Sequence, residues 1–152
     1  MDLEGDLAFA SYHFWMEVLE LIDNDVESAV TLWADSGLTR PWNDPVEDFR
    51  RAIEGPTSAV LGIKNDGELV GTVMVGSDGH RGWVYYLCVS TSHRRVGLGS
   101  ELMKAAEEWL REIGAVKVQL MVRSENESGM NFYARAGYEL SDVNVLARWL
   151  SA

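Results

Sequence analysis

The sequence predicts an α/β protein of the α+β type, with helices packed on a mixed, mainly antiparallel central sheet. The turn signal Asn65-Asp66-Gly67 lies between two β-rich runs, which is typical of a hairpin. Apolar residues at positions 98, 102, 105, 106, 109, 110 and 113 fall on one face of a helix. In chain order the predicted elements are β-α-α-β-β-β-α-β-α-β-β, an order that favours this layered architecture.

The first strand and helix are predicted from the dense apolar residues near the N-terminus. Residues 15–22 are apolar enough for a strand, although the alternation is only partial. Asp23 or Asp25 is placed to cap the next helix, because a carboxylate accepts free amide protons of the first turn. Residues 26–33 have helical spacing, and Gly37 ends the helix.

A loop, a short helix and the hairpin come next. Residues 38–45 contain two prolines, which disfavour the helical region for the residues before them and predict a loop. Pro45 suits the first turn of a helix that ends at Gly55. Residues 58–63 and 68–75 are the predicted strands of the hairpin.

The middle of the chain contains its most distinct strand and helix. A polar turn over residues 76–82 leads into residues 83–89, a β-branched and aromatic run typical of a central strand. The one-faced helix begins at Leu98 and ends at Gly114. The two elements are separated by a short arginine- and glycine-containing turn.

Three shorter elements complete the prediction. Residues 116–122 are expected to form a strand, and residues 128–135 a short helix stopped by Gly137. Residues 138–140 and 145–150 are expected to form a final strand pair.

Composition indicates one globular domain, residues 1–152, with a loosely held arm over residues 1–13. No apolar run approaches the roughly 20 residues that span a bilayer, and the acidic N-terminus has no export signal, so a cytoplasmic protein is expected.

The net charge of −11 disfavours a nucleic-acid partner and favours cationic acceptors. With one cysteine and no metal-ligand spacing, neither a disulfide nor a metal is expected. A homodimer is one assembly that the sequence leaves open.

The turn Arg94-x-x-Gly97-x-Gly99, between a strand and a helix, is suited to binding a pyrophosphate. Glycines let backbone amides approach anionic oxygens, the helix N-terminus adds partial positive charge, and Arg94 and Arg95 add full charges. Taken alone, a Gly-x-Gly is more often a plain turn. A dinucleotide fingerprint is disfavoured because position 102 is Leu102, and the Gly-Lys-Ser/Thr of a P-loop is absent.

Residues 87–99, Leu-Cys-Val-Ser-Thr-Ser-His-Arg-Arg-Val-Gly-Leu-Gly, resemble the acetyl-CoA motif of the GNAT N-acetyltransferase superfamily. A second signature of that family is Asn126, followed by Tyr133 and then by Ala136-Gly137-Tyr138. The segments 40–45 and 78–82 resemble the YpeA-like subgroup. Thr91 and Arg95 depart from the superfamily's frequent Pro and Gly, both outside the core pattern.

The resemblance implies the acyl-CoA N-acyltransferase fold and transfer of an acetyl group from acetyl-CoA to an amine, by direct attack in a ternary complex. Strands 83–89 and 116–122 would splay to admit the pantetheine arm, and Asn126 would bond its amide. Tyr133 would protonate the leaving thiolate. The implied coenzyme-binding residues are Cys88, Val89, Arg94, Arg95, Val96, Gly97, Leu98, Gly99, Ser100 and Asn126.

Several of these residues also have plain structural interpretations. From the residues alone, core packing is the favoured interpretation of Tyr133 on its short helix, and only the resemblance favours the general acid. Spacing alone likewise favours a helix cap for Asn126, a use that does not exclude the other. Cys88 suggests a covalent acyl-enzyme, but its apolar strand offers no group to form a thiolate, so a buried small hydrophobe is preferred.

The acceptor half of the site is less defined. No carboxylate occurs on the two strands where many family members place a general base; Tyr85, Tyr86 and Met121 stand there. The candidate acceptor residues are Trp42, Asp44, Asp78, His80 and Tyr86, each also explicable as an ordinary turn, loop or core residue. The missing carboxylate also suits a second hypothesis, a non-catalytic acyl-CoA-binding module.

Overall fold

The computed structural model describes residues 16–151. They form two compact units, a larger one that ends at Met121 and a smaller one that begins at Val122. The arm expected over residues 1–13, and Trp15 of the first predicted strand, lie outside the described residues. No helix in this part of the chain is both long and apolar enough to cross a membrane.

The larger unit contains a five-stranded sheet with its strands in chain order. Neighbours are antiparallel except β4 and β5, which are parallel. This mixed, mainly antiparallel sheet confirms the predicted fold class. The strands are β1 (Val18–Glu20), β2 (Ser58–Asn65), β3 (Glu68–Ser77), β4 (Gly82–Val89) and β5 (Val118–Gln119).

The hairpin between β2 and β3 has the turn that the sequence predicts. Asn65 pairs with Glu68, so Asp66 and Gly67 form a two-residue loop. Both have positive φ, 50° and 81°, as a type I′ turn requires. The register of the hairpin is therefore set by two residues that tolerate the left-handed conformation.

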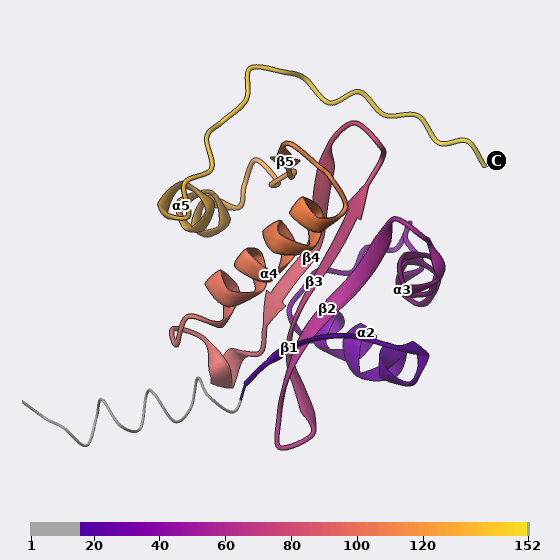
Figure 1. Ribbon diagram of the computed structural model, residues 1–152, viewed down its shortest axis with the longest axis vertical. Coiled ribbons are helices and arrows are strands. Elements are labelled where there is room, and N and C mark those ends of the chain that lie inside the picture. The colour runs from indigo at the N-terminus through magenta and orange to yellow at the C-terminus, as the bar shows by residue number, and fades with distance from the viewer. Residues whose placement is uncertain (1–15, 152) are drawn as a thin grey trace, which may run out of the picture. The chain divides into compact units, whose positions relative to one another are not determined.

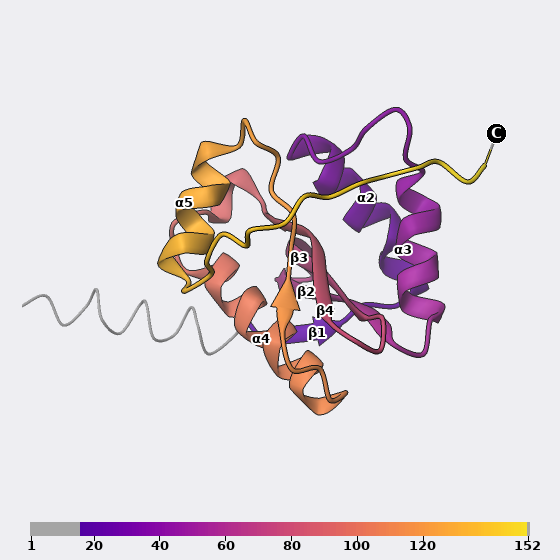
Figure 2. The ribbon, with the colours of Figure 1, turned by 90° about the horizontal axis from the view of Figure 1, so that it is seen from above.

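Helices cover both faces of this sheet, as Figures 1 and 2 show. α2 (Val26–Asp35) and α3 (Pro45–Glu54) pack on one face, and α4 (Leu98–Glu112) packs on the other. Trp33 and Phe49 are fully buried beneath the first pair, and Leu102 and Leu110 beneath α4. Burial of each such side chain stabilises the fold by about 1.5–3 kcal/mol.

Asp25 precedes α2 but does not cap it. The α2 amides receive no side-chain cap, and residues 23–25 form a 3-10 turn, η1 (Asp23–Asp25). Asp25 Oδ2 instead accepts from Ile22 N at 2.9 Å, and Asp25 Oδ1 pairs with Lys64 Nζ at 2.7 Å. The predicted cap at Asp23 or Asp25 is wrong, because the turn directs the Asp25 carboxylate back toward Ile22 and β2.

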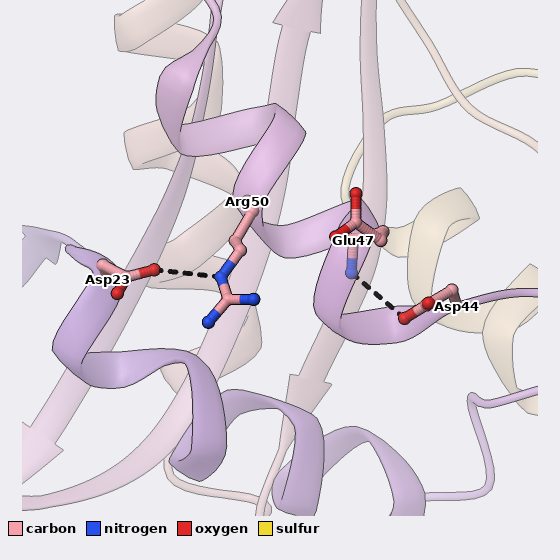
Figure 3. A network of polar contacts seen from close by, with 4 residues as sticks. All are labelled: Asp23, Asp44, Glu47 and Arg50. Atoms are coloured by element: carbon pink, nitrogen blue, oxygen red, sulfur yellow. Dashed lines mark hydrogen bonds and ion pairs between the residues drawn. The ribbon is translucent and has the colours of Figure 1, made fainter.

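α3 begins as predicted, with Pro45 in its first turn and Asp44 before it. Asp44 Oδ1 accepts from Glu47 N at 3.1 Å, which satisfies an amide at the start of the helix. Arg50 reaches from α3 to Asp23 with an Nε–Oδ1 distance of 3.2 Å (Figure 3). Both side chains of this pair are largely exposed, so it contributes only about 0–1 kcal/mol.

The strand expected over residues 116–122 is reduced to Val118–Gln119. These two residues pair with the first two of β4, and the ladder then stops. A strand is maintained only where a neighbour pairs with its backbone, so the shorter β5 follows from the course of β4.

The smaller unit contains α5 (Glu127–Arg135), which begins one residue before the helix predicted over residues 128–135 and ends where predicted. Asn126 Oδ1 accepts from Gly129 N at 3.0 Å, and Gly137 follows the helix with φ of 94°. Residues 138–151 contain no strand, so the predicted final strand pair is wrong. Their apolar pattern suits a strand, but the two segments do not pair with each other.

Candidate active site

β4 loses its neighbour after two residues. Gly82 pairs with Val118 and Trp83 with Gln119, and no further β4–β5 pair follows among the described residues. β4 nevertheless continues to Val89 beside β3. Residues 84–89 therefore have no strand partner on the β5 side in this part of the chain. Their outward N–H and C=O groups can hydrogen-bond an extended ligand.

The direction of the backbone groups at the end of β4 follows from its register with β3. Ser90 N donates to Val70 O at 2.8 Å, so Ser90 faces β3. Because facing alternates along an antiparallel pair, Cys88 also faces β3 and Val89 faces the open edge. Arg94 Nε donates to Val89 O at 3.1 Å. Of the two residues expected to bind the pantetheine arm, Val89 lies at the open edge and Cys88 in the inner ladder.

A β-bulge lies just beyond the last β4–β5 pair. Two residues of β4, Tyr86 and Leu87, oppose the single residue Val73 of β3. Tyr86 has φ of 51°, a conformation that costs a non-glycine residue on the order of 1–3 kcal/mol. Such a bulge bends its strand and increases the local twist, which explains why β4 and β5 separate here.

A network of side chains from three elements holds the bulge. The Tyr86 ring stacks on Trp33 of α2, with centroids 3.9 Å apart and planes 12° apart. Trp33 Nε1 donates to Thr72 Oγ1 at 2.8 Å, and that hydroxyl donates to Tyr86 O at 2.9 Å. Tyr86 OH donates to Asp48 Oδ2 of α3 at 2.8 Å. Sequence reasoning missed Trp33, Thr72 and Asp48, because only the tertiary fold brings them to Tyr86.

The turn after β4 presents backbone amides. η2 (Thr91–His93) follows the strand, and α4 begins after Gly97, whose φ is 86°. Arg95 also has positive φ, 68°. No side chain caps the first turn of α4, so its amides are available to an anion.

The predicted phosphate-binding residues therefore lie together in one turn and the helix start that follows it. The side chains of Arg94 and Arg95 are exposed there. Leu98 is buried in the core, so only its backbone can contact a ligand. The full set is Arg94, Arg95, Val96, Gly97, Leu98, Gly99 and Ser100.

His93 braces this turn, a role that the sequence did not indicate. Its Nδ1 lies 2.7 Å from Ser90 Oγ and 3.0 Å from Ser92 Oγ, and its Nε2 lies 3.3 Å from Asn65 Nδ2. The turn is thus attached to the β2–β3 hairpin. Among residues 16–151, no group of three His, Cys, Asp or Glu side chains is placed to hold a metal.

Cys88 is buried, with its sulfur 3.3 Å from Ser36 Oγ. Burial raises the pKa of its thiol, and this outweighs the opposite influence of Ser36, Arg94 and Thr72. A thiol with a raised pKa carries little thiolate at neutral pH, so the environment does not favour a covalent acyl-enzyme.

Two of the candidate acceptor residues, Asp44 and Asp78, accept hydrogen bonds from nearby backbone amides. Asp44 caps α3, as described above. Asp78 Oδ1 accepts from the amides of His80 at 2.8 Å and Arg81 at 2.7 Å, and these hydrogen bonds lower the pKa of the Asp78 carboxyl. A carboxylate with a lowered pKa is a weaker base. Trp42, in the loop before α3, is 56% exposed.

Tyr133 and Asn126 belong to the smaller unit. Asn126 takes the helix-cap role that its position permits. The Tyr133 ring contacts Phe132 and Tyr138 edge to face, with centroids 5.1 Å and 5.8 Å away. Burial raises the pKa of Tyr133 to about 12. The phenol therefore stays protonated at neutral pH, although a raised pKa also makes it a weaker acid.

Comparison with known proteins agrees with this arrangement. Residues 25–138 match the model of the acetyltransferase (GNAT) family. The match covers most of the chain and includes β4, the turn and α5. The chain belongs to the acetyltransferase (GNAT) family.

Solved structures show the same fold at low sequence identity. The aminoglycoside N-acetyltransferase AAC(6')-Iy, in complex with the bisubstrate analogue CoA-S-monomethyl-acetylneamine, superposes with a TM-score of 0.76 at 16% identity, covering 90% of this chain and 99% of that one. The ribosomal-protein-alanine N-acetyltransferase of Brucella melitensis biovar Abortus 2308 superposes with a TM-score of 0.71 at 21% identity, and the match covers 88% of this chain and 99% of that one. The aminoglycoside acetyltransferase meta-AAC0020, from an uncultured soil metagenomic sample, superposes with a TM-score of 0.73 at 17% identity. The match covers 91% of this chain and 97% of that one.

Proposed function

We propose that this protein is a cytoplasmic N-acetyltransferase that moves an acetyl group from acetyl-CoA to a primary amine. One observation carries the proposal: the open edge of β4 leads directly into an uncapped helix N-terminus with two exposed arginines. An extended arm ending in a pyrophosphate has the chemistry that matches both features. The family match on both sides of Met121 supports a single acetyltransferase domain, and segments 40–45 and 78–82 support the YpeA-like subgroup.

In this proposal the coenzyme lies along β4. The amides at the start of α4, with Arg94 and Arg95, bind the pyrophosphate. Val89 pairs with the pantetheine arm through its backbone, since its N–H and C=O face the open edge. Asn126 contributes a side-chain amide to the arm in addition to capping α5.

The reaction is direct attack. The free amine nitrogen forms a bond to the thioester carbonyl carbon, the nitrogen loses a proton to solvent, and the carbon–sulfur bond breaks. Tyr133 donates its proton to the departing thiolate and regains one from solvent. The products are the N-acetylated amine and CoA with a free thiol, and Cys88 takes no part.

The test is release of CoA thiol across a panel of amines. We expect intersecting initial-velocity patterns for acetyl-CoA and amine, and a loss in kcat of about 10²-fold or more for Tyr133→Phe with little change in the KM for acetyl-CoA. Phe132→Leu, next to it on α5, is the matched control for disturbed packing.

Two results would contradict the proposal. Parallel velocity patterns would indicate a covalent acyl-enzyme. Tight binding of acetyl-CoA without turnover of any amine would instead support the non-catalytic acyl-CoA-binding module.

A further inference from the structure

The fold supplies a carboxylate beside β4 that the two strands lack. Asp48 lies on α3, yet its Oδ2 accepts from the hydroxyl of Tyr86 on β4 at 2.8 Å. Tyr86 lies in the part of β4 that has no β5 partner. Both side chains are only half-buried and remain accessible to solvent.

Tyr86 is held rigidly enough to present this carboxylate at a defined place. Its ring stacks on Trp33, and its backbone carbonyl accepts from Thr72 Oγ1. Both contacts keep the tyrosine hydroxyl on the side of the sheet covered by α2 and α3. The second oxygen of Asp48 remains available to a ligand, because a carboxylate accepts several hydrogen bonds.

Ion pairs neutralise two carboxylates in this part of the fold: Asp23 pairs with Arg50, and Asp25 pairs with Lys64. Asp44 and Glu47, near Asp48 at the start of α3, form no ion pair among the described residues, but both are exposed whereas Asp48 is half-buried. Among the described residues, Asp48 forms no ion pair, and its hydrogen-bond partner is a neutral phenol. A half-buried carboxylate without a cation favours a positively charged ligand, and the net charge of −11 adds to that attraction.

The bound cation is not the amine that reacts. A carboxylate beside an ammonium group stabilises its charged form and so raises the pKa of that amine. An amine must be uncharged to attack a thioester. An ammonium group that stays charged in a salt contact with Asp48 is thus distinct from the nitrogen that attacks, and a diamine or polyamine acceptor supplies such a second group.

We propose that Asp48, oriented by Tyr86, binds a second ammonium group of the acceptor and selects small di- or polyamines over monoamines. This deepens the function proposed above and depends on it. The pair Asp48–Tyr86 is then the specificity-determining contact of the acceptor site.

The experiment compares α,ω-diamines with amino alcohols of matched length, which replace the distal ammonium group with a neutral hydroxyl. We expect the wild type to prefer the diamine in kcat/KM by about tenfold. In Asp48→Asn the kcat/KM for the diamine should fall to that for the amino alcohol. The KM for acetyl-CoA should not change.

Glu47→Gln is the matched control, since Glu47 is exposed and precedes Asp48 on the same helix. It removes the same charge from α3, and we expect it to keep the diamine preference. Tyr86→Phe keeps the ring stack but releases Asp48, and we expect it to lower the ratio of the diamine kcat/KM to the amino alcohol kcat/KM. Far-ultraviolet circular dichroism checks the fold of each variant.

Outcomes separate this proposal from the one on which it rests. If the wild type acetylates both acceptors equally, or if Asp48→Asn lowers both equally, the ammonium contact is refuted while N-acetyl transfer stands. If Glu47→Gln loses as much of the diamine preference as Asp48→Asn does, the contact is refuted too, because the preference then depends only on long-range charge. If the wild type acetylates no amine, both proposals fall.

Discussion

Tyr86 combines a left-handed backbone with a side chain held from three directions. The ring stacks on Trp33, the hydroxyl donates to Asp48, and the carbonyl accepts from Thr72. Burial and the Asp48 carboxylate raise the pKa of Tyr86, so its hydroxyl stays a donor at neutral pH. These contacts offset the strain at φ of 51°, and the bulge persists because the surrounding residues determine it.

Thr72→Val tests how far this network stabilises the fold. The change keeps the shape but removes the hydroxyl, which leaves Trp33 Nε1 and Tyr86 O without their partner. We expect a loss in the free energy of unfolding of about 1–3 kcal/mol by urea denaturation. Thr72→Ser keeps the hydroxyl and should lose less. Equal losses in the two variants would show that the methyl group, and not the hydrogen bonds, matters.

At the scale of elements, Asp25 connects the start of α2 to β2. Burial alone would raise the pKa of its carboxyl, but the Ile22 amide and Lys64 together outweigh burial and lower it. A carboxyl whose pKa is lowered in the folded state stabilises the protein at pH values above its ordinary pKa of 3.8. That contribution is lost as the pH falls through the folded-state pKa.

Asp25→Asn removes this charge, and we expect a loss in stability at pH 7 of about 1–3 kcal/mol. The difference from the wild type should narrow as the pH falls below the ordinary carboxyl value, because the wild type then protonates. Urea denaturation of both proteins at a series of pH values measures this difference in the free energy of unfolding. Asp23→Asn, whose pair with Arg50 is exposed, should change stability by less than about 1 kcal/mol. A difference that stays constant to low pH would refute the assignment to Asp25.

The strands β4 and β5 show how one element determines another. The bulge at Tyr86 and Leu87 bends β4 away after Trp83, and β5 ends where its partner leaves. The same bend exposes the edge beside Val89. A shorter β5 than the sequence predicts is thus part of the proposed coenzyme site.

For the whole molecule, a net charge of −11 opposes a polyanion, so coenzyme binding depends on a local positive site. We expect acetyl-CoA at about 100 times its Kd to stabilise the fold by about 2.7 kcal/mol in a thermal-shift measurement, while NAD does not. Arg95→Gln should weaken binding by about tenfold, since a charge-assisted hydrogen bond contributes about 1.5–3 kcal/mol.

Lys104→Gln is the control for this measurement, because Lys104 is a 75% exposed cation on α4 outside the turn. It should leave the affinity nearly unchanged. Stabilisation by NAD and not by acetyl-CoA would overturn the proposed ligand.

Much of the architecture was predictable from short stretches of sequence. The β2–β3 turn, α4 and the glycine-containing turn before it depend on contacts within a few residues, which local patterns reveal. The helix predicted over residues 128–135 placed Tyr133 on it and Asn126 just before it, as observed. The failures were Asp25, the length of β5 and the final strand pair, where the partner lies elsewhere in the chain or is absent from the smaller unit.

The sequence by itself determined the fold class, the family and the turn suited to pyrophosphate, because these depend on local periodicity, glycine conformation and charge. Only the tertiary structure decided that β4 bulges at Tyr86, that Val89 rather than Cys88 faces the open edge, and that Asp48 meets the Tyr86 hydroxyl. Register and helix packing govern these contacts. They join residues far apart in the chain, where no spacing in the sequence records which side chains will meet.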